Sequence, residues 1–193
     1  MPNANPTHVV TGKVRFSYEH VMRPQASAND PTAEPKYSVT MLIPKTDTAT
    51  KARIDAGIKA ALQLGVKNRK IKEGLPLDKL PTPLYDGDGV RADGYTPFGP
   101  ECKGMWVFTA SCGQDRKPQV VDAAGNPIID ASEIYSGCWG RVSLDFYAYS
   151  VPQRTGIGAG LCNVQKLADG EPLGGARPSA SDDFGATDDD PLG

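Results

Sequence analysis

Three side chains that can contact a nucleic acid alternate along one predicted strand, residues 140–150. Arg141, Tyr147 and Tyr149 are separated by even numbers of residues, so they share one face of the strand. An exposed tyrosine ring is a flat surface on which a base can stack, worth on the order of 1–3 kcal/mol per base, and a nearby guanidinium can contact a phosphate or the ring. This combination is typical of sequence-tolerant binding of single strands. Outward tyrosines also cover neighbouring elements in other proteins, so this strand alone leaves both interpretations open.

Basic side chains recur on other predicted elements. Lys13 and Arg15 alternate with apolar residues on the first strand, and Lys36 begins the second strand. Arg116 and Lys117 follow the third strand. Cations on several elements of one sheet favour phosphate binding. The candidate DNA-contacting residues are therefore Lys13, Arg15, Lys36, Arg116, Lys117, Arg141, Tyr147 and Tyr149, with Trp106, Trp139 and Phe98 as further aromatic candidates.

The last sixteen residues, 178–193, are acidic and contain no Lys or Arg. With five of the 23 Asp and Glu residues lying there, residues 1–177 contain 18 acidic side chains against 21 basic ones. We expect a disordered tail, because it offers too little apolar surface to offset the entropy of ordering it. A tethered polyanion competes with nucleic acid for a basic surface, and apolar residues among carboxylates suit a partner protein, although a purely solubilising tail is the alternative. The tail candidates are Asp182, Asp183, Phe184, Asp188, Asp189, Asp190 and Leu192.

Fewer residues of the sequence support a catalytic function. Three aspartates, Asp86, Asp88 and Asp93, could gather magnesium as a nuclease requires, but no His or Lys lies near them as a base and turn formation explains them better. The four cysteines form no C-x-x-C pair and only two histidines are present, which disfavours a zinc site and a nucleophilic dyad. Gly156, Gly158 and Gly160 lack the spacing of a dinucleotide-binding loop and predict a flexible loop that approaches a bound backbone closely. We therefore expect a protein that is not an enzyme and needs no cofactor or metal.

The predicted elements are mostly short strands. Apolar alternation predicts strands at 10–16, 36–43, 105–111 and 140–150, a return strand at 159–167, and a hairpin from 105–111 to 119–121. On the first strand we expect Val10, Val14 and Phe16 to face the core. A helix should begin after Asp47 or Thr48 and end at Gly65. The pattern predicts a mainly β, mostly antiparallel barrel over residues 1–177, with one inserted α-helix and the acidic tail at 178–193.

Neither a secretory signal nor an apolar run of membrane-spanning length is visible. We therefore expect no membrane contact and a cytoplasmic location with reduced thiols. The sequence leaves the oligomeric state open, including a homodimer.

Four stretches resemble a family of bacteriophage single-stranded DNA-binding proteins: TGKVRFSY from residue 11, KYSVTMLIPK from 36, YSGCWGRVSLDFYAY from 135 and GAGLCNVQKLADGEPLGG from 158. The resemblance implies an OB-fold barrel, binding of single-stranded DNA with little sequence preference, and an acidic tail that recruits replication or recombination enzymes in the cytoplasm of the infected bacterial host. In this chain Gly193 follows Leu192 and Phe184 lies inside the tail, which leaves open the identity of the apolar residue that a partner would grip. Duplex DNA binding, a nuclease and an adaptor protein without DNA binding are the alternatives.

Overall fold

Of the strands in the described part of the chain, five have 9 to 15 residues and three have 3 residues each. The computed structural model describes residues 5–27 and 30–174, which contain eight strands and one α-helix. The elements are β1 (His8–Val10), β2 (Val14–Gln25), β3 (Lys36–Pro44), α1 (Thr48–Lys67), β4 (Leu84–Asp86), β5 (Met105–Gly113), β6 (Gln119–Val121), β7 (Trp139–Val151) and β8 (Arg154–Ala168), with short 3-10 turns at Leu77–Lys79, Pro100–Cys102, Gln114–Arg116 and Ala131–Glu133.

Five of the strands close into a barrel. Antiparallel pairing joins β2 to β3, β3 to β5, β8 to β7 and β7 back to β2, and one parallel pairing joins β5 to β8. Around the barrel the strands are therefore the first, second, third, fifth and fourth in chain order, a Greek-key arrangement of the OB type. The predicted fold class, a mainly β OB-like barrel with an inserted helix, is confirmed, and the helix is inserted between β3 and β5.

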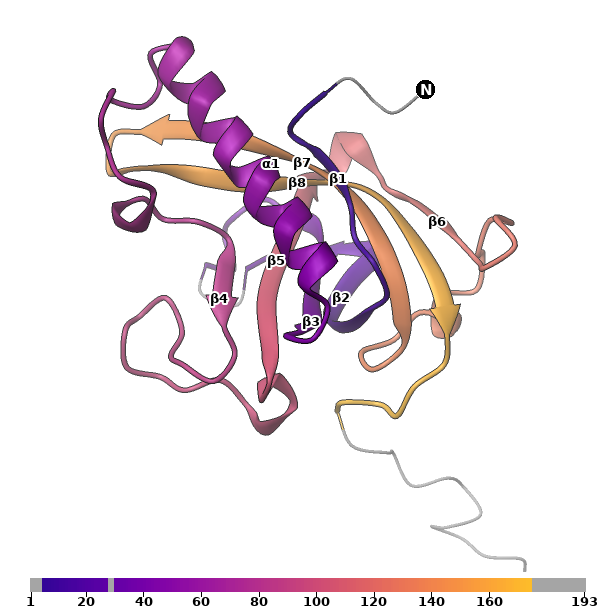
Figure 1. Cartoon of the computed structure of the whole chain (residues 1–193). Coiled ribbons are helices and arrows are strands. Elements are labelled where there is room, and N and C mark those ends of the chain that lie inside the picture. The colour runs from indigo at the N-terminus through magenta and orange to yellow at the C-terminus, as the bar shows by residue number, and fades with distance from the viewer. Residues whose placement is uncertain (1–4, 28–29, 175–193) are drawn as a thin grey trace, which may run out of the picture.

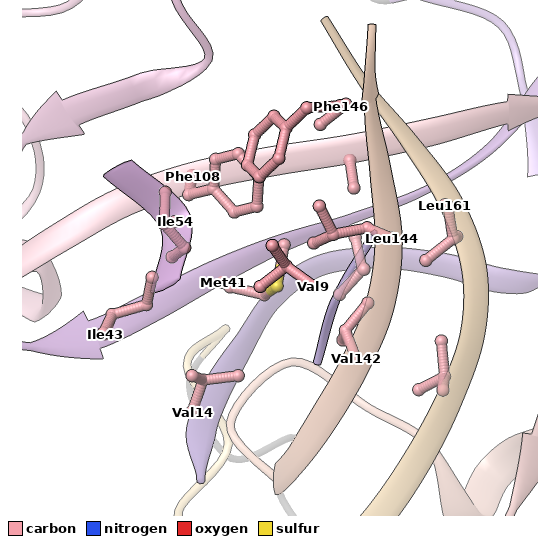
Figure 2. Close-up of a cluster of buried hydrophobic side chains, with 14 of the residues drawn as sticks. Val9, Val14, Met41, Ile43, Ile54, Phe108, Val142, Leu144, Phe146 and Leu161 are labelled. Atoms are coloured by element: carbon pink, nitrogen blue, oxygen red, sulfur yellow. The ribbon is translucent and has the colours of Figure 1, made fainter. Parts of the chain in front are cut away.

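Large apolar side chains fill the barrel interior. Phe16, Met41, Phe108 and Leu144 are fully buried, and Figure 2 shows the last three directed into a common core with Phe146. The rings of Phe108 and Phe146 lie 5.6 Å apart between centroids. Each such side chain contributes about 1.5–3 kcal/mol when it is fully buried. The result is a well-packed scaffold that positions the side chains on its outer face.

Helix α1 begins where the sequence predicts. Asp47 is its N-cap, and its carboxylate accepts a hydrogen bond from the backbone N of Thr50 at 3.0 Å. The helix continues two residues past Gly65, to Lys67. The face predicted to be apolar is buried, at Ile54, Ile58 and Ala61. No helix within residues 5–27 and 30–174 has the length and apolar character needed to cross a membrane.

Two glycines let α1 approach the barrel closely. A Cβ at Gly57 would lie 2.6 Å from Cδ2 of Phe146, and one at Gly65 would lie 2.5 Å from Cβ of Ala148. Both contacts are with side chains of β7, and Figure 1 shows the helix lying across β7, β8 and β1. Gly65, which the sequence suggested as the end of the helix, is thus a packing residue inside it.

The first predicted strand is divided in two. Residues 11–13 separate β1 from β2, and the prediction that Val10 faces the core is wrong: Val10 is exposed, whereas Val9 and Thr11 are buried. Thr11 is inside because its hydroxyl accepts a hydrogen bond from the backbone N of Val142 at 3.0 Å. A polar residue therefore occupies the inward position by supplying a partner to β7.

The predicted hairpin between 105–111 and 119–121 is wrong. β6 does not pair with β5; it pairs in parallel with β8, through Val120 and Val164. β5 and β6 therefore lie on the same side of β8, joined by the Gln114–Arg116 turn. This places the basic residues of that turn beside β8 instead of at a hairpin tip.

Candidate nucleic-acid interface

A groove runs over the outer face of the barrel at β3, β5 and β8. It consists of two adjoining cavities, of about 700 and 610 Å³, that share Lys36 and Ser111 in their walls. The larger cavity extends past Arg116 and Lys117 to Tyr147 on β7. The smaller extends towards β2 and the segment that precedes β3. OB-folds bind oligonucleotides on the face of their second and third strands, which in this barrel are β3 and β5.

Small hydroxyl side chains form the floor of the groove on β3 and β5. Ser38 pairs with Ser111 and Thr40 with Thr109 across the two strands, and the hydroxyls of Thr40 and Thr109 are 2.8 Å apart. Such groups can donate to phosphates or accept from bases without filling the groove. The floor is therefore polar, uncharged and shallow.

Two tyrosines rest on a strand that has no side chains beneath them. Tyr147 pairs with Gly158 and Tyr149 with Gly156. A Cβ at Gly158 would lie 2.6 Å from Cζ of Tyr147, and one at Gly156 would lie 2.7 Å from Oη of Tyr149. Contacts this short do not occur, so the rings can lie against β8 only because these positions are glycine. The glycines predicted to form a loop instead belong to β8.

The tyrosine rings are accessible neighbours. The ring centroids of Tyr147 and Tyr149 are 6.5 Å apart with planes inclined by 57°, and the side chain of Tyr147 is 49% exposed. Cζ of Arg154, at the start of β8, is 5.6 Å from the Tyr149 centroid. Arg154 is a candidate that sequence reasoning missed, because residues 151–158 were taken as a loop. The three side chains can present two stacking surfaces and one cation.

Three cationic side chains and two carboxylates line the larger cavity. Lys36, Arg116 and Lys117 are exposed, and the acidic residues are Asp115 and Asp145. Lys36 pairs with Gly113, immediately before the turn that carries Arg116, so β3 and the turn bring the cations together. Arg116 approaches Asp115 only at 3.9 Å, and both side chains are more than 80% exposed. Its guanidinium is therefore available to a phosphate.

Tyr18 is a second candidate, this one aromatic, that the sequence did not reveal. It lines the smaller cavity with His20, and it is 62% exposed with φ of 44°. Strict alternation would place it on the same side of β2 as the buried Phe16. A register irregularity between Ser17 and His20 turns it outwards. A non-glycine residue in this left-handed conformation is held at a cost, which favours a role for its position.

Three predicted contact residues lie away from the groove, at the opposite end of β7. Lys13 Nζ and Arg15 Cζ lie 5.4 and 5.9 Å from the ring centroid of Trp139. Arg15 also donates to the backbone carbonyls of Gly137, at 3.2 Å, and Glu171, at 2.6 Å. These bonds hold the segment that leads to the C-terminus. The structure does not bring this cluster together with Tyr147.

The remaining aromatic and cationic candidates are separate from the groove. Trp106 packs partly against the core, on the same side of β5 as the buried Phe108, and Lys45 and Lys51 approach its ring at 5.0 and 4.8 Å. Arg141 does share the outer face of β7 with Tyr147, but it binds the side chain of Gln165 and lines a different cavity. Phe98 packs against Tyr85, with centroids 6.2 Å apart.

The aspartates considered for a nuclease are engaged in structural contacts. Lys45 Nζ bridges Asp86 and Asp88 at 2.6 and 2.7 Å, and its hydrogen bonds hold the pKa of both carboxyls below the usual value. Asp93 accepts from the backbone N of Tyr95 and of Thr96 within a turn. The three carboxylates do not form a metal-binding group among the described residues.

The two groove thiols are poor nucleophiles. Burial raises the pKa of Cys112, and burial together with a hydrogen bond to Asp145 raises the pKa of Cys162 to about 11. Both therefore remain protonated at neutral pH. The tail candidates, from Asp182 to Leu192, lie outside the described residues.

Comparison with known proteins identifies the family. The family model described as the single-stranded DNA-binding protein of Enterobacter phage Enc34 matches residues 7–192. The chain belongs to this family. Protein p50 of Acyrthosiphon pisum secondary endosymbiont phage 1 is 30% identical over 153 residues, which cover 77% of this chain and 78% of p50. The predicted family resemblance is thus confirmed, and the family's activity is one of binding, not of catalysis.

Solved structures of phage single-stranded DNA-binding proteins are similar to this chain. The single-stranded DNA-binding protein of bacteriophage Enc34, in complex with single-stranded DNA, is 30% identical, with a TM-score of 0.70 over 86% of this chain and 89% of that chain. The single-stranded DNA-binding protein gp2.5 of bacteriophage T7 is 15% identical, with a TM-score of 0.60 over 89% of this chain and 97% of that chain. At that identity the second likeness shows the shared fold alone.

Proposed function

We propose that this chain binds single-stranded DNA, with little sequence preference, in the groove over β3, β5 and β8. The observation that carries the proposal is the placement of Tyr147 against the glycines of β8 in the cavity that Lys36, Arg116 and Lys117 also line. Tyr149 is the neighbouring ring on β7. Bases stack on the rings while the cations neutralise phosphates. Every base has a stacking face, so this mode of binding does not depend on sequence. Family membership supports the same activity.

Binding of this kind requires unpaired bases. The cations attract any phosphate backbone, including duplex DNA, but the tyrosine rings can stack only on bases released from a helix. We therefore expect single strands to bind more tightly than duplex DNA of equal length. Fluorescence anisotropy with a labelled oligo-dT and a matched duplex tests this preference. Equal affinity for the two would refute the stacking part of the proposal, and no binding to either would favour an adaptor role.

The acidic residues 178–193 supply a competitor for the same cations. Arg15 and Ser136 hold the backbone of Glu171 and Leu173 near the start of β7. Tyr147 lies eight residues further along β7, or about 26 Å in an extended strand. The nineteen residues 175–193 span at most roughly 65 Å, enough to reach the groove.

The biological role proposed for the chain follows from this competition. The protein coats single-stranded DNA during phage replication or recombination in the host cytoplasm, and residues 178–193 recruit the enzymes of those processes when DNA displaces them from the groove. Phe184 and Leu192 are the two apolar candidates for the partner contact. A pull-down of host and phage replication enzymes with the full chain, compared with F184A and L192A, distinguishes them. Recruitment that survives deletion of residues 178–193 would contradict this role.

A further inference from the structure

One cluster of three different ligand types lies in the wall of the groove. His8 of β1, Asp145 of β7 and Cys162 of β8 converge there, with His8 Nδ1 2.8 Å from Asp145 Oδ1 and Cys162 Sγ 3.3 Å from Asp145 Oδ2. The potential ligand atoms all lie within 4.8 Å of one another. Among the described residues this is the only group of three or more His, Cys, Asp or Glu side chains so arranged. Each side chain is half-buried.

The ligand set matches a borderline-soft divalent cation. Cys162 is a thiol in the free protein and would release its proton on binding a metal, and thiolate, imidazole and carboxylate together suit Zn²⁺. Metal–ligand lengths of about 2.0–2.3 Å at tetrahedral angles place ligand atoms roughly 3.4–3.6 Å apart. The separations of His8 Nδ1 from Asp145 Oδ1, 2.8 Å, and of Cys162 Sγ from Asp145 Oδ2, 3.3 Å, differ from this range by well under 1 Å. We propose that His8, Asp145 and Cys162 bind Zn²⁺ or a similar ion through Nδ1, a carboxylate oxygen and Sγ.

The scaffold suits such a site in two respects. β1 pairs with β7 so that His8 is directly opposite Asp145, and β7 pairs with β8 so that Asp145 is opposite Gly160, two residues from Cys162. The ligands are thus fixed by three paired strands, which is more precise than a loop. Asp145 and Cys162 also line the larger cavity, which provides an entry path and a fourth coordination position open to water or an anion.

Cobalt substitution tests the site on the full chain. Co²⁺ added to the reduced protein should give sulfur-to-cobalt charge-transfer absorption and the intense visible bands of tetrahedral coordination. C162S should abolish the charge transfer, and H8Q should weaken Co²⁺ binding at least tenfold. C112S is the matched control, because Cys112 is another half-buried thiol of the same cavity, and it should leave the spectrum unchanged. The tail aspartates contain no sulfur and cannot produce the charge-transfer band.

Two outcomes would overturn the site. One is the absence of charge transfer in the wild-type protein, and the other is loss of the band in C112S with retention in C162S. As a second measurement independent of the spectrum, Zn²⁺ should raise the Tm of the wild-type protein and of C112S but not that of C162S, since a ligand stabilises only the state that binds it. Equal shifts in all three would also overturn the proposal.

A bound ion would change the charge of the groove. It would offset the negative charge of Asp145 beside Lys36 and Arg116, so this consequence rests on the proposed function. Zn²⁺ should then tighten oligo-dT binding by the wild-type protein and not by C162S. If the charge-transfer band is present but Zn²⁺ leaves DNA affinity unchanged, the effect on DNA is wrong and the site stands. DNA binding without added metal tests the proposed function separately.

Discussion

The glycine at 158 offers a way to move one tyrosine ring without altering it. In G158A the new Cβ would lie 2.6 Å from Cζ and 2.7 Å from Oη of Tyr147. The ring must leave its place on β8, and it can do so cheaply because it is the end of a side chain exposed at its outer edge. No charge, donor or acceptor is added or removed. We therefore expect the fold to survive and the stacking surface to be displaced.

The expected loss of DNA affinity has an upper limit. Losing one stacking platform costs about 1–3 kcal/mol, or about 5- to 150-fold in Kd for oligo-dT. Y147A should approach this loss, and G158A should not exceed it. G160A is the matched control, because its Cβ would lie 3.4 Å from the carbonyl of Asp145 and 3.8 Å from the Tyr147 ring, which are ordinary contacts. It should bind DNA within about twofold of the wild-type protein.

Anisotropy titrations test whether G158A weakens DNA binding by displacing the Tyr147 ring. The proteins compared are G158A, G160A, Y147A and the double variant G158A/Y147A. If G158A acts through the ring, it should have no further effect once the ring is removed, so that the two losses are not additive. Thermal unfolding of each variant checks that the fold is retained. Equal losses in G158A and G160A, or full additivity in the double variant, would refute the assignment of Tyr147 as a platform supported by β8.

Three other predictions follow from the groove, from the acidic residues 178–193 and from one half-buried carboxyl. K36A should reduce the slope of log Kd against log salt for oligo-dT by about 0.7, while K13A, outside the groove, should leave it unchanged; equal slopes in the two variants would contradict the placement of the groove. Deleting residues 178–193 should tighten DNA binding at low salt and have little effect at high salt, as measured by anisotropy, and unaltered affinity at low salt would remove the competition. Burial raises the pKa of Glu19 to about 7, so its ionisation costs stability as pH rises from about 4.5 through 7. The free energy of unfolding of E19Q, measured with urea, should therefore exceed that of the wild-type protein by about 1 kcal/mol at pH 8, a value reduced for solvent screening. At pH 4 the two should be equal.

Residues whose neighbours lie close in the chain were predictable. The alternation of β7 places Val142, Leu144 and Phe146 inside and Tyr147 outside, as expected, because each residue of a regular strand points opposite to the one before it. The cap of α1 at Asp47 depends on Thr50 alone, three residues away. In both cases the physical cause acts within a few residues, so the local sequence pattern is enough to predict the structure.

The face of a strand on which a residue lies does not give its position along that strand, as the basic residues show. Lys13, Arg15 and Arg141 were assigned to the outer side of the sheet from their period of two, but that period says nothing of position along a strand. Arg15 pairs with Trp139, at the first residue of β7, far from Tyr147. Tyr18 was missed for a different reason. A local irregularity in β2 turns it outwards, and alternation assumes that no such irregularity occurs.

The relation of the tyrosines to the glycines required one further fact, the register of the β7–β8 hairpin. Only Pro152 and Gln153 separate the two strands, and with so short a turn the residues equidistant from it must pair. Tyr149 then meets Gly156 and Tyr147 meets Gly158, as the structure has them. The dipeptide lacks the Asn-Gly or Asp-Gly signature of a two-residue turn, which is why residues 151–158 read as a loop. With the turn located, the alternating glycines become a predictable support for the aromatic side chains opposite them, and the binding face follows from the hairpin itself.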